Sequence, residues 1–291
     1  MKLIRHGEPN KEHTGIVLND KYYDTSAFGQ DYNEDFFAGG GLDRLRQFVA
    51  QHEAPVPDGG TRLPALAAGI RLGSPVARPS KIVCIGLNYA DHAKETGATP
   101  PPEPVIFLKA TSSLSGPGDD IIIPRDSQKT DWEVELAVVI KKKASYVSEE
   151  EALEYVAGYC LHTDVSEREF QLERSGTWDK GKCCDTFAPL GPWLATPDEM
   201  GDINKLRLWL KVNGRTMQDG TTANLIFNIP FLVSYSSRFM TLLPGDVIST
   251  GTPAGVGMGM KPSVYLKPGD LVELGIDGLG IAMQRVKAYK K

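Results

Sequence analysis

The chain has 291 residues, 41% of them hydrophobic and 24% charged, which is enough for one large domain, or a main domain with a smaller companion, around a full core. The net charge is −5 and the longest basic run is Lys141–Lys143, so a nucleic-acid-binding surface is not expected. No aliphatic stretch approaches the ~20 residues that span a bilayer. Four cysteines at irregular spacing match neither a disulfide framework nor a zinc motif. We therefore expect a cytoplasmic protein without membrane or nucleic-acid partners.

Residues 1–75 have the pattern of a small β-rich domain. Two short apolar runs, 15–18 and 21–24, flank Asn19-Asp20, which is typical of a hairpin with a tight turn. Apolar residues at i, i+3, i+6 and i+7 predict a helix over 42–49. The Pro- and Gly-containing segments 54–60 and 73–80 are candidate linkers, and we place the domain boundary between residues 75 and 76.

Residues 76–291 are rich in strands and poor in long helical patterns. The strands are expected at 81–85, 105–108, 121–123, 134–140, 207–212, 247–250, 271–276 and 281–286, and helices at 89–95, 148–155 and 229–239. Strands without regular intervening helices argue against a doubly wound α/β fold. The predicted fold class is therefore α+β, mainly β.

Two motifs suggest functions that the rest of the chain does not support. The run Leu3–Glu8 resembles the histidine phosphatase motif, but such enzymes need a second catalytic His, usually after a Gly, and none of the other histidines follows a Gly. We therefore interpret His6 as a surface residue of the small domain. The glycine run 255–259 is followed by Lys261-Pro262, which cannot open the helix of a dinucleotide site. This run is interpreted as a loop at the rim of a site.

Three acidic residues suggest a metal site. Glu133 and Glu135 alternate on one strand and therefore share a face, where two desolvated carboxylates are costly unless a cation lies between them. Asp164 follows the apolar segment 156–161 and could complete the set. Oxygen ligands of this kind suit Mg²⁺, Mn²⁺ or Ca²⁺. The alternatives are an exposed acidic strand end and, for Asp164, the N-cap of a helix at 166–173.

A further pair, His92 and Glu95, lies three residues apart in a predicted helix, so the two side chains share a helical face. A Glu that binds one imidazole nitrogen leaves the other nitrogen free to accept a proton from water. A surface His–Glu pair without catalytic function is the alternative. The segment 178–189 contains cations that could meet an anionic substrate, or it is simply an exposed loop.

Together and in this order, these segments resemble the fumarylacetoacetate hydrolase family. The resemblance covers about residues 80–290. Its matching segments are 85–95, 104–109, 132–140, 158–159 leading to 164–166, 181–182, 185–193, 212–214 and 249–257. It implies a mixed β-roll fold, here in the long form with a small N-terminal domain, and a homodimer.

The resemblance also implies roles for individual residues. The metal ligands would be Glu133, Glu135 and Asp164, binding Mg²⁺, with Mn²⁺ or Ca²⁺ as alternatives. The water-activating pair would be His92 and Glu95. Polar groups facing the substrate or its developing charge would be Lys182, Gln171, Thr252 and Lys109.

Within the family, segments 167–174, 234–240 and 257–262 are similar to hydrolases of 2,4-diketo-3-deoxy sugar acids, which act in deoxysugar catabolism. This similarity implies cleavage of a C–C bond in an acylpyruvate-type 2-oxo acid to pyruvate and a carboxylic acid. An oxaloacetate-type decarboxylase or a 2-hydroxyhepta-2,4-diene-1,7-dioate-type isomerase is the alternative, since the carboxylates serve all three reactions. A non-catalytic sugar-acid binding protein is a more remote one.

Overall fold

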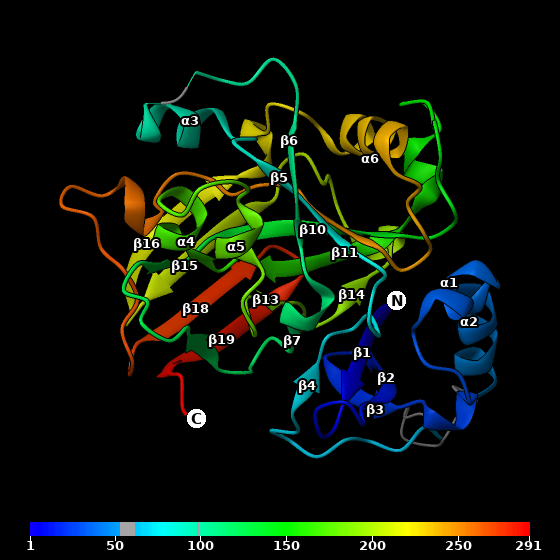
Figure 1. Ribbon diagram of the computed structural model, residues 1–291. Helices are drawn as coiled ribbons and strands as arrows, with labels where there is room; N and C mark the ends of the chain where they lie inside the picture. Colours follow the sequence, from blue (N-terminus) through cyan, green and yellow to red (C-terminus); the bar gives the residue numbers. More distant parts are fainter. Residues whose placement is uncertain (53–61, 98) are drawn as a thin grey trace.

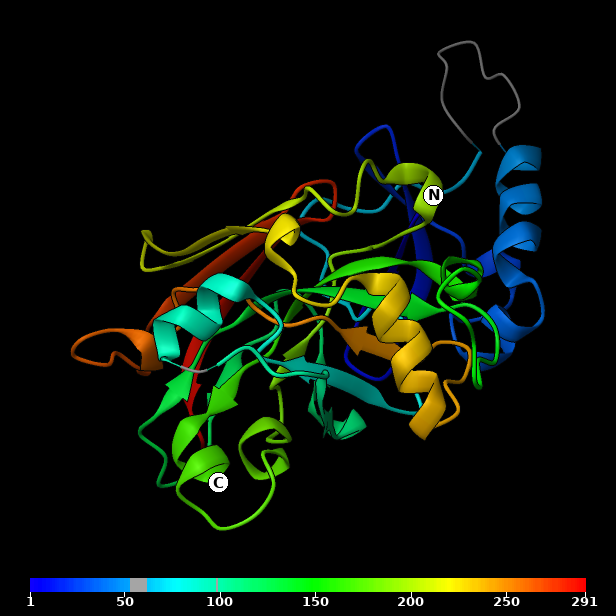
Figure 2. The same ribbon diagram turned by 90° about the horizontal axis from the view of Figure 1, so that it is seen from above.

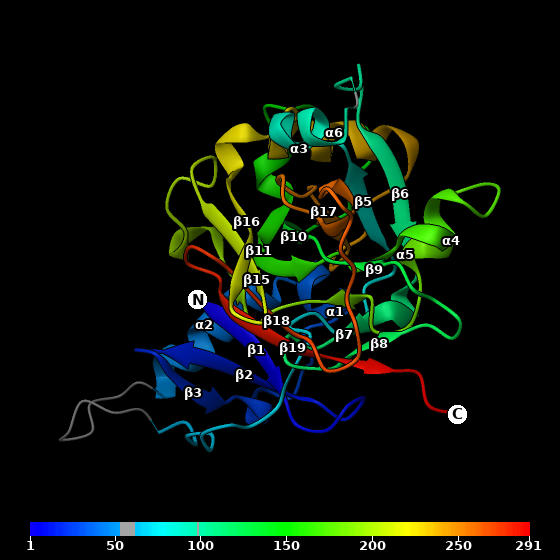
Figure 3. The ribbon, with the colours of Figure 1, turned by 90° about the vertical axis from the view of Figure 1, so that its left-hand side faces the viewer.

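The computed structural model describes residues 1–52, 62–97 and 99–291, so the candidate linker at 54–60 lies outside the described residues. Two sheets, one of ten strands and one of five, form most of the molecule (Figure 1). Helices α1 and α2 lie beside β1–β3 at one end, while α3 and α6 lie on the other side of the strands (Figures 1 and 3). This arrangement confirms the mainly β, α+β class predicted from the sequence.

The ten-stranded sheet runs through both the N-terminal and the C-terminal parts of the chain. Its order is β3 (Lys21–Asp24), β2 (His13–Leu18), β1 (Lys2–His6), β14 (Leu194–Ala195), β11 (Val156–Thr163), β10 (Val134–Ile140), β17 (Val247–Ser249), β5 (Ile82–Gly86) and β6 (Val105–Lys109), with β4 (Leu72–Gly73) beside β1. Strand β1 pairs with β14, so the first 75 residues share a sheet with the rest of the chain.

The second large sheet covers one face of the first. Its order is β16 (Arg215–Thr221), β15 (Arg207–Val212), β18 (Leu271–Ile276), β19 (Gly280–Ala288) and β8 (Ile121–Ile123). Two small ladders complete the strands: β9 (Thr130–Asp131) with β12 (Ser166–Glu167), and β7 (Leu114–Ser115) with β13 (Ala188–Pro189).

Helices are short and lie around the sheets, as Figure 2 shows from above. The α-helices are α1 (Glu34–Ala38), α2 (Gly41–His52), α3 (Ala90–Thr96), α4 (Arg168–Leu172), α5 (Asp179–Lys182) and α6 (Ile229–Phe239). Single 3₁₀ turns occur at Ser26–Phe28, Thr111–Ser113, Ala152–Tyr155, Pro197–Glu199, Thr222–Asn224 and Gly257–Gly259. None of the helices within the described residues is long and apolar enough to cross a membrane.

Strand β10 is buried on both faces, which explains its continuous apolar sequence. Its even-numbered residues pack in the core that includes β15 and β18, whereas Ala137 and Val139 belong to the core that includes α1 and α2. Because side chains alternate along a strand, Glu133 and Glu135 lie on the same side as Ala137 and Val139. The fold therefore turns two carboxylates away from the five-stranded sheet.

Most predicted elements are found within one or two residues of their predicted bounds, and the hairpin turn at Asn19-Asp20 is present with both residues at positive φ. Two predictions are wrong. The α-helix over 148–155 is only a 3₁₀ turn, Ala152–Tyr155, because β11 begins at the next residue. His6 is buried, not on the surface, because β1 lies inside the sheet between β2 and its other partners β14 and β4.

Candidate active site and metal centre

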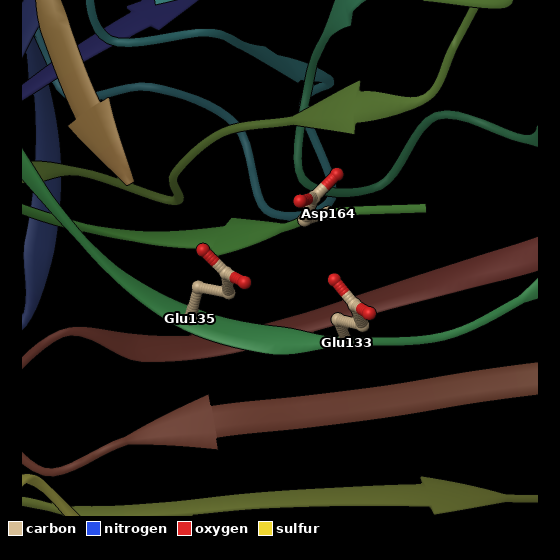
Figure 4. Close-up of side chains that lie close together, drawn as sticks. All are labelled: Glu133, Glu135 and Asp164. Carbon is tan, nitrogen blue, oxygen red and sulfur yellow. The ribbon is translucent and has the colours of Figure 1, made fainter. Parts of the chain in front are cut away.

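The three predicted carboxylates meet at one end of the β10–β11 pair. Glu135 lies on β10, Glu133 immediately precedes that strand, and Asp164 immediately follows β11. The antiparallel register pairs Val134 with Thr163, which brings the two chain segments together at this end. Ligand oxygens of the three residues all lie within 4.8 Å of one another. Figure 4 shows the two glutamates projecting from the same side of one strand toward Asp164.

All three carboxylates are buried, and buried cations surround two of them. The Lys182 ammonium donates to Glu133 Oε2 and to Asp164 Oδ2, at 2.7 Å in each case. Arg168 Nη2 donates to Glu133 Oε1 at 2.7 Å. Lys109 donates to Asp164 and, at 3.0 Å, to the carbonyl of Val165. Asp164 is therefore not the N-cap of the following helix, a role that Glu167 fills.

The protonation states follow from this arrangement. Burial, together with the nearby charges of Asp164 and Glu133, raises the pKa of Glu135 well above its usual value. Burial alone would raise the pKa of Asp164, but Lys109 and Lys182 lower it below its usual value. Burial opposes the charge on Lys182, yet Asp164 and Glu133 raise the pKa of that ammonium. A set of three hard oxygen donors that attracts cations in this way fits Mg²⁺, Mn²⁺ or Ca²⁺.

Glu135 is held by a separate group of residues. Ser249, at the end of β17, donates its hydroxyl to Glu135 Oε2, and the amide of Gly251 donates to the same oxygen at 3.0 Å. His162 Nδ1 lies 2.6 Å from the Ser249 hydroxyl, and burial lowers the pKa of His162 to about 3. A neutral His162 and Ser249 thus fix the orientation of this carboxylate.

His92 and Glu95 lie on α3, which follows β5 over the mouth of the site. His92 Nδ1 is 3.4 Å from Glu95 Oε2. Both carboxylate oxygens of Glu95 also accept from the amide of Gly255 at 3.0 Å. Burial raises the pKa of Glu95, but the bonds from His92 and Gly255 outweigh it and lower the pKa below its usual value. The glycine run at 255–259 therefore forms a loop packed against this pair, at the rim of the site.

Two buried residues of the site, Arg168 and Asp131, were not predicted from the sequence. Besides Glu133, Arg168 binds two more side chains. Its Nη1 donates to Gln171 Oε1 at 3.0 Å, and its Nε donates to Asp131 at 2.8 Å. Asp131 is fully buried and also accepts from the amides of Gly257 and Met258 at 2.7 and 3.0 Å. Sequence spacing gives no signal for Asp131, whereas an arginine three residues before Gln171 on one helix could have been found.

The site opens into a pocket of about 200 Å³. The predicted residues in its lining are His92, Glu133, Glu135, Gln171, Lys182 and Thr252. Asp164 lies behind Lys182. Lys109 also lies behind the triad as a fully buried partner of Asp164, which differs from the substrate contact that the resemblance implied. Thr252 donates its hydroxyl to the carbonyl of Val134 at 2.9 Å, so it also fixes the strand that carries Glu135.

The chain belongs to the fumarylacetoacetate hydrolase family. The family model described as "Fumarylacetoacetate (FAA) hydrolase C-terminal" matches residues 81–287, which confirms the family predicted from the sequence. A curated relative from Burkholderia multivorans is 52% identical over the whole of both chains, and its name proposes a hydrolase without a substrate.

Three solved structures share the whole fold. Fumarylacetoacetate hydrolase from Exiguobacterium antarcticum is 35% identical, with a TM-score of 0.84 over 99% of this chain and 100% of that one. Maleylpyruvate hydrolase from Sphingobium sp. SYK-6, crystallised with manganese(II) and pyruvate, is 29% identical, with a TM-score of 0.80 over all of both chains. 2-Hydroxyhepta-2,4-diene-1,7-dioate isomerase from Mycobacterium marinum is 30% identical, with a TM-score of 0.75 over all of both chains.

Proposed function

We propose that this protein is a divalent-metal-dependent hydrolase that cleaves a C–C bond in an acylpyruvate-type 2,4-dioxo acid and releases pyruvate and a carboxylic acid. The observation that carries the proposal is that Glu133, Glu135, His92 and Lys182 line one small pocket. Asp164 completes the triad behind Lys182, and Glu95 contacts His92. Within this class, the sequence resemblance offers a 2,4-diketo-3-deoxy sugar acid as one candidate substrate, to be compared with other acyl tails.

In the proposed reaction, His92 takes a proton from water. Its Nδ1 faces Glu95, so the other ring nitrogen, Nε2, is the base, and Glu95 holds the ring in place. The oxygen of that water attacks the carbonyl carbon two positions beyond the 2-oxo group. The C3–C4 bond then breaks, its electron pair forms the enolate of pyruvate, and a proton completes pyruvate. Water and substrate together account for all atoms of the two products.

Negative charge develops on substrate oxygens during both steps. Lys182 lines the pocket, and Asp164 and Glu133 keep it protonated, so it supplies a positive charge at this position. Glu133, Glu135 and Asp164 would hold a divalent cation, which would act as a Lewis acid toward the 2-oxo acid. The neighbour crystallised with manganese(II) and pyruvate supports both the class of ion and the product.

The direct test is pyruvate release from acetylpyruvate and from 5-hydroxy-2,4-dioxohexanoate, the deoxyrhamnonate-type substrate, with oxaloacetate as a third substrate. Each is assayed with Mg²⁺ or Mn²⁺ and again with excess EDTA. We expect metal-dependent pyruvate together with an equal amount of acetate or lactate. Pyruvate from oxaloacetate alone would assign a decarboxylase, and double-bond migration without pyruvate would assign an isomerase.

A matched pair of variants tests the assignment of the site. Glu135→Gln removes one charge from the triad, so we expect it to lose bound metal and activity together. Glu149→Gln is the control, because Glu149 is exposed. Activity in Glu135→Gln equal to that of the control would refute the proposed metal site.

A further inference from the structure

The pocket is lined by two kinds of side chain. One kind comprises the charged and polar groups already described around the triad. The other kind, which we call the apolar half of the lining, comprises six side chains: Ile85, Leu87, Phe107, Leu172, Trp178 and Met258. Apart from the indole N–H of Trp178, these six carry no hydrogen-bonding group. A substrate whose 2-oxo acid end lies at the triad would therefore extend the rest of its chain along apolar carbon.

The apolar half begins directly beside the reactive groups. The ring of Phe107, on β6, lies 4.9 Å from the Lys182 ammonium, measured to the ring centroid. Trp178 packs against Phe107 with 5.4 Å between ring centroids and an interplanar angle of 60°. The two rings therefore lie next to the Lys182 ammonium, within reach of the acyl group of a substrate whose 2-oxo acid end is bound at the triad.

The backbone beneath Trp178 is shaped to accept it. A Cβ on Gly86 would lie 2.4 Å from Cζ3 of Trp178, so only glycine lets the indole approach this closely. The next residue, Leu87, has a φ of 53°, which is costly for a leucine. Asn88 fixes this bend through bonds from its amide to the carbonyls of Thr250 and Phe227, at 2.8 and 3.1 Å. The fold thus holds apolar groups at the pocket wall in spite of backbone strain.

Several polar groups of the pocket already bond within the protein. Arg168 donates to Asp131, Glu133 and Gln171 through three different nitrogens. Thr252 has already donated its only proton. A hydroxyl or carboxylate on a tail that lies against the six apolar side chains would lose water and could gain a hydrogen bond from them only through the Trp178 indole, which lowers affinity.

We propose that this apolar half is the binding site for the acyl tail, and that the preferred substrates are acylpyruvates with a short aliphatic or aromatic tail. This inference rests on the proposed function. It differs from the deoxy sugar acid implied by the sequence resemblance, whose tail carries a hydroxyl, and from a maleyl tail, which carries a carboxylate. The volume of about 200 Å³ limits the tail to a short aliphatic chain or a single ring.

The test compares isosteric substrates of the metal-loaded enzyme. 5-Methyl-2,4-dioxohexanoate replaces the hydroxyl of 5-hydroxy-2,4-dioxohexanoate by a methyl group, and 7-methyl-2,4-dioxooctanoate replaces the carboxylate of succinylpyruvate by an isopropyl group. We expect kcat/KM to favour the apolar member of each pair by about 10- to 100-fold. Lengthening acetylpyruvate should raise kcat/KM about fourfold per buried methylene until the pocket is filled. Equal values, or a preference for the hydroxyl or carboxylate, would overturn the proposal.

A pair of variants locates the preference. Trp178→Ala should reduce the ratio of kcat/KM between the methyl and hydroxyl substrates at least fivefold, whereas Phe239→Ala, which removes an exposed ring from α6, should leave the ratio unchanged. An unchanged ratio in Trp178→Ala would remove Trp178 from the tail site. If no substrate releases pyruvate, the proposed function is wrong. The tail preference is then decided by calorimetric Kd values for the same pairs with Mn²⁺, and equal Kd values overturn it.

Discussion

Metal binding to this site is expected to release one proton, and Glu135 is its source. Burial and two neighbouring carboxylates raise the pKa of Glu135, which favours the protonated form of this side chain when no metal is bound. A carboxylate that ligates a cation must be ionised, so the proton leaves as the metal enters. The affinity for metal should therefore rise with pH as long as the pH stays below the raised pKa.

Two neighbouring groups, Asp164 and Lys182, are not expected to add a second proton. Asp164 is already ionised, because Lys109 and Lys182 outweigh burial and lower its pKa. Lys182 keeps its proton, because Asp164 and Glu133 outweigh burial and raise its pKa. One proton corresponds to a tenfold fall in Kd per pH unit, or about 1.4 kcal/mol. Above the pKa of Glu135 the Kd should become independent of pH.

Titration calorimetry with Mn²⁺ measures this directly. The apparent enthalpy, recorded at one pH in two buffers of different ionisation enthalpy, gives the number of protons released, and Kd is measured from pH 5.5 to 8.5. We expect the number of protons released to be largest at the acidic end of this range. Glu135→Gln should bind more weakly and release no proton. A Kd that does not change with pH in the wild-type protein, or a proton still released by Glu135→Gln, would refute the reasoning.

Three substitutions test other parts of the site. His92→Ala should keep Mn²⁺ affinity within about threefold but lower kcat by ~10²–10⁴, since it removes only the base; near-normal turnover would refute that role. Lys182→Met leaves Glu133 and Asp164 without their shared cation. The free energy of unfolding of the metal-free protein, measured with denaturant, should therefore fall by about 3–5 kcal/mol, and added Mn²⁺ should stabilise this variant more than it stabilises the wild type. Asp131→Asn weakens the hydrogen bonds that this side chain accepts from Arg168 and from the amides of residues 257 and 258. We therefore expect kcat/KM to fall about 10- to 100-fold while Mn²⁺ stays bound. Unchanged kinetics would show that Asp131 has no positioning role.

The sequence was sufficient for the parts of the site that depend on local periodicity. Glu133 and Glu135 share a face because a strand alternates, and His92 and Glu95 share one because a helix repeats every 3.6 residues. Strand periodicity also predicted most of the strands of the two large sheets. Where a segment was too short for a period to repeat, prediction failed: residues 148–155 carry a helix-start pattern, but β11 begins after one 3₁₀ turn.

Partners that depend on distant pairing could not be found in this way. Asp131 meets the loop at 257–258 across more than 120 residues, and Lys109 meets Asp164 across 55. The burial of His6 likewise follows from the pairing of β1 with β14, which lies more than 190 residues away in the sequence. These contacts are set by sheet order, and no local pattern encodes sheet order.

The buried charges around the triad also bear on the substrate. Among the described residues of the site, four buried carboxylates (Asp131, Glu133, Glu135 and Asp164) face three buried cations (Lys109, Arg168 and Lys182). A proton on Glu135, which its raised pKa favours, would bring the formal charge of this group to zero and lower the cost of burying it without metal. A divalent cation that displaces the Glu135 proton leaves one positive charge. The single carboxylate of a monoanionic 2,4-dioxo acid restores neutrality, whereas a second carboxylate on the tail would add an unbalanced charge beside Phe107 and Trp178.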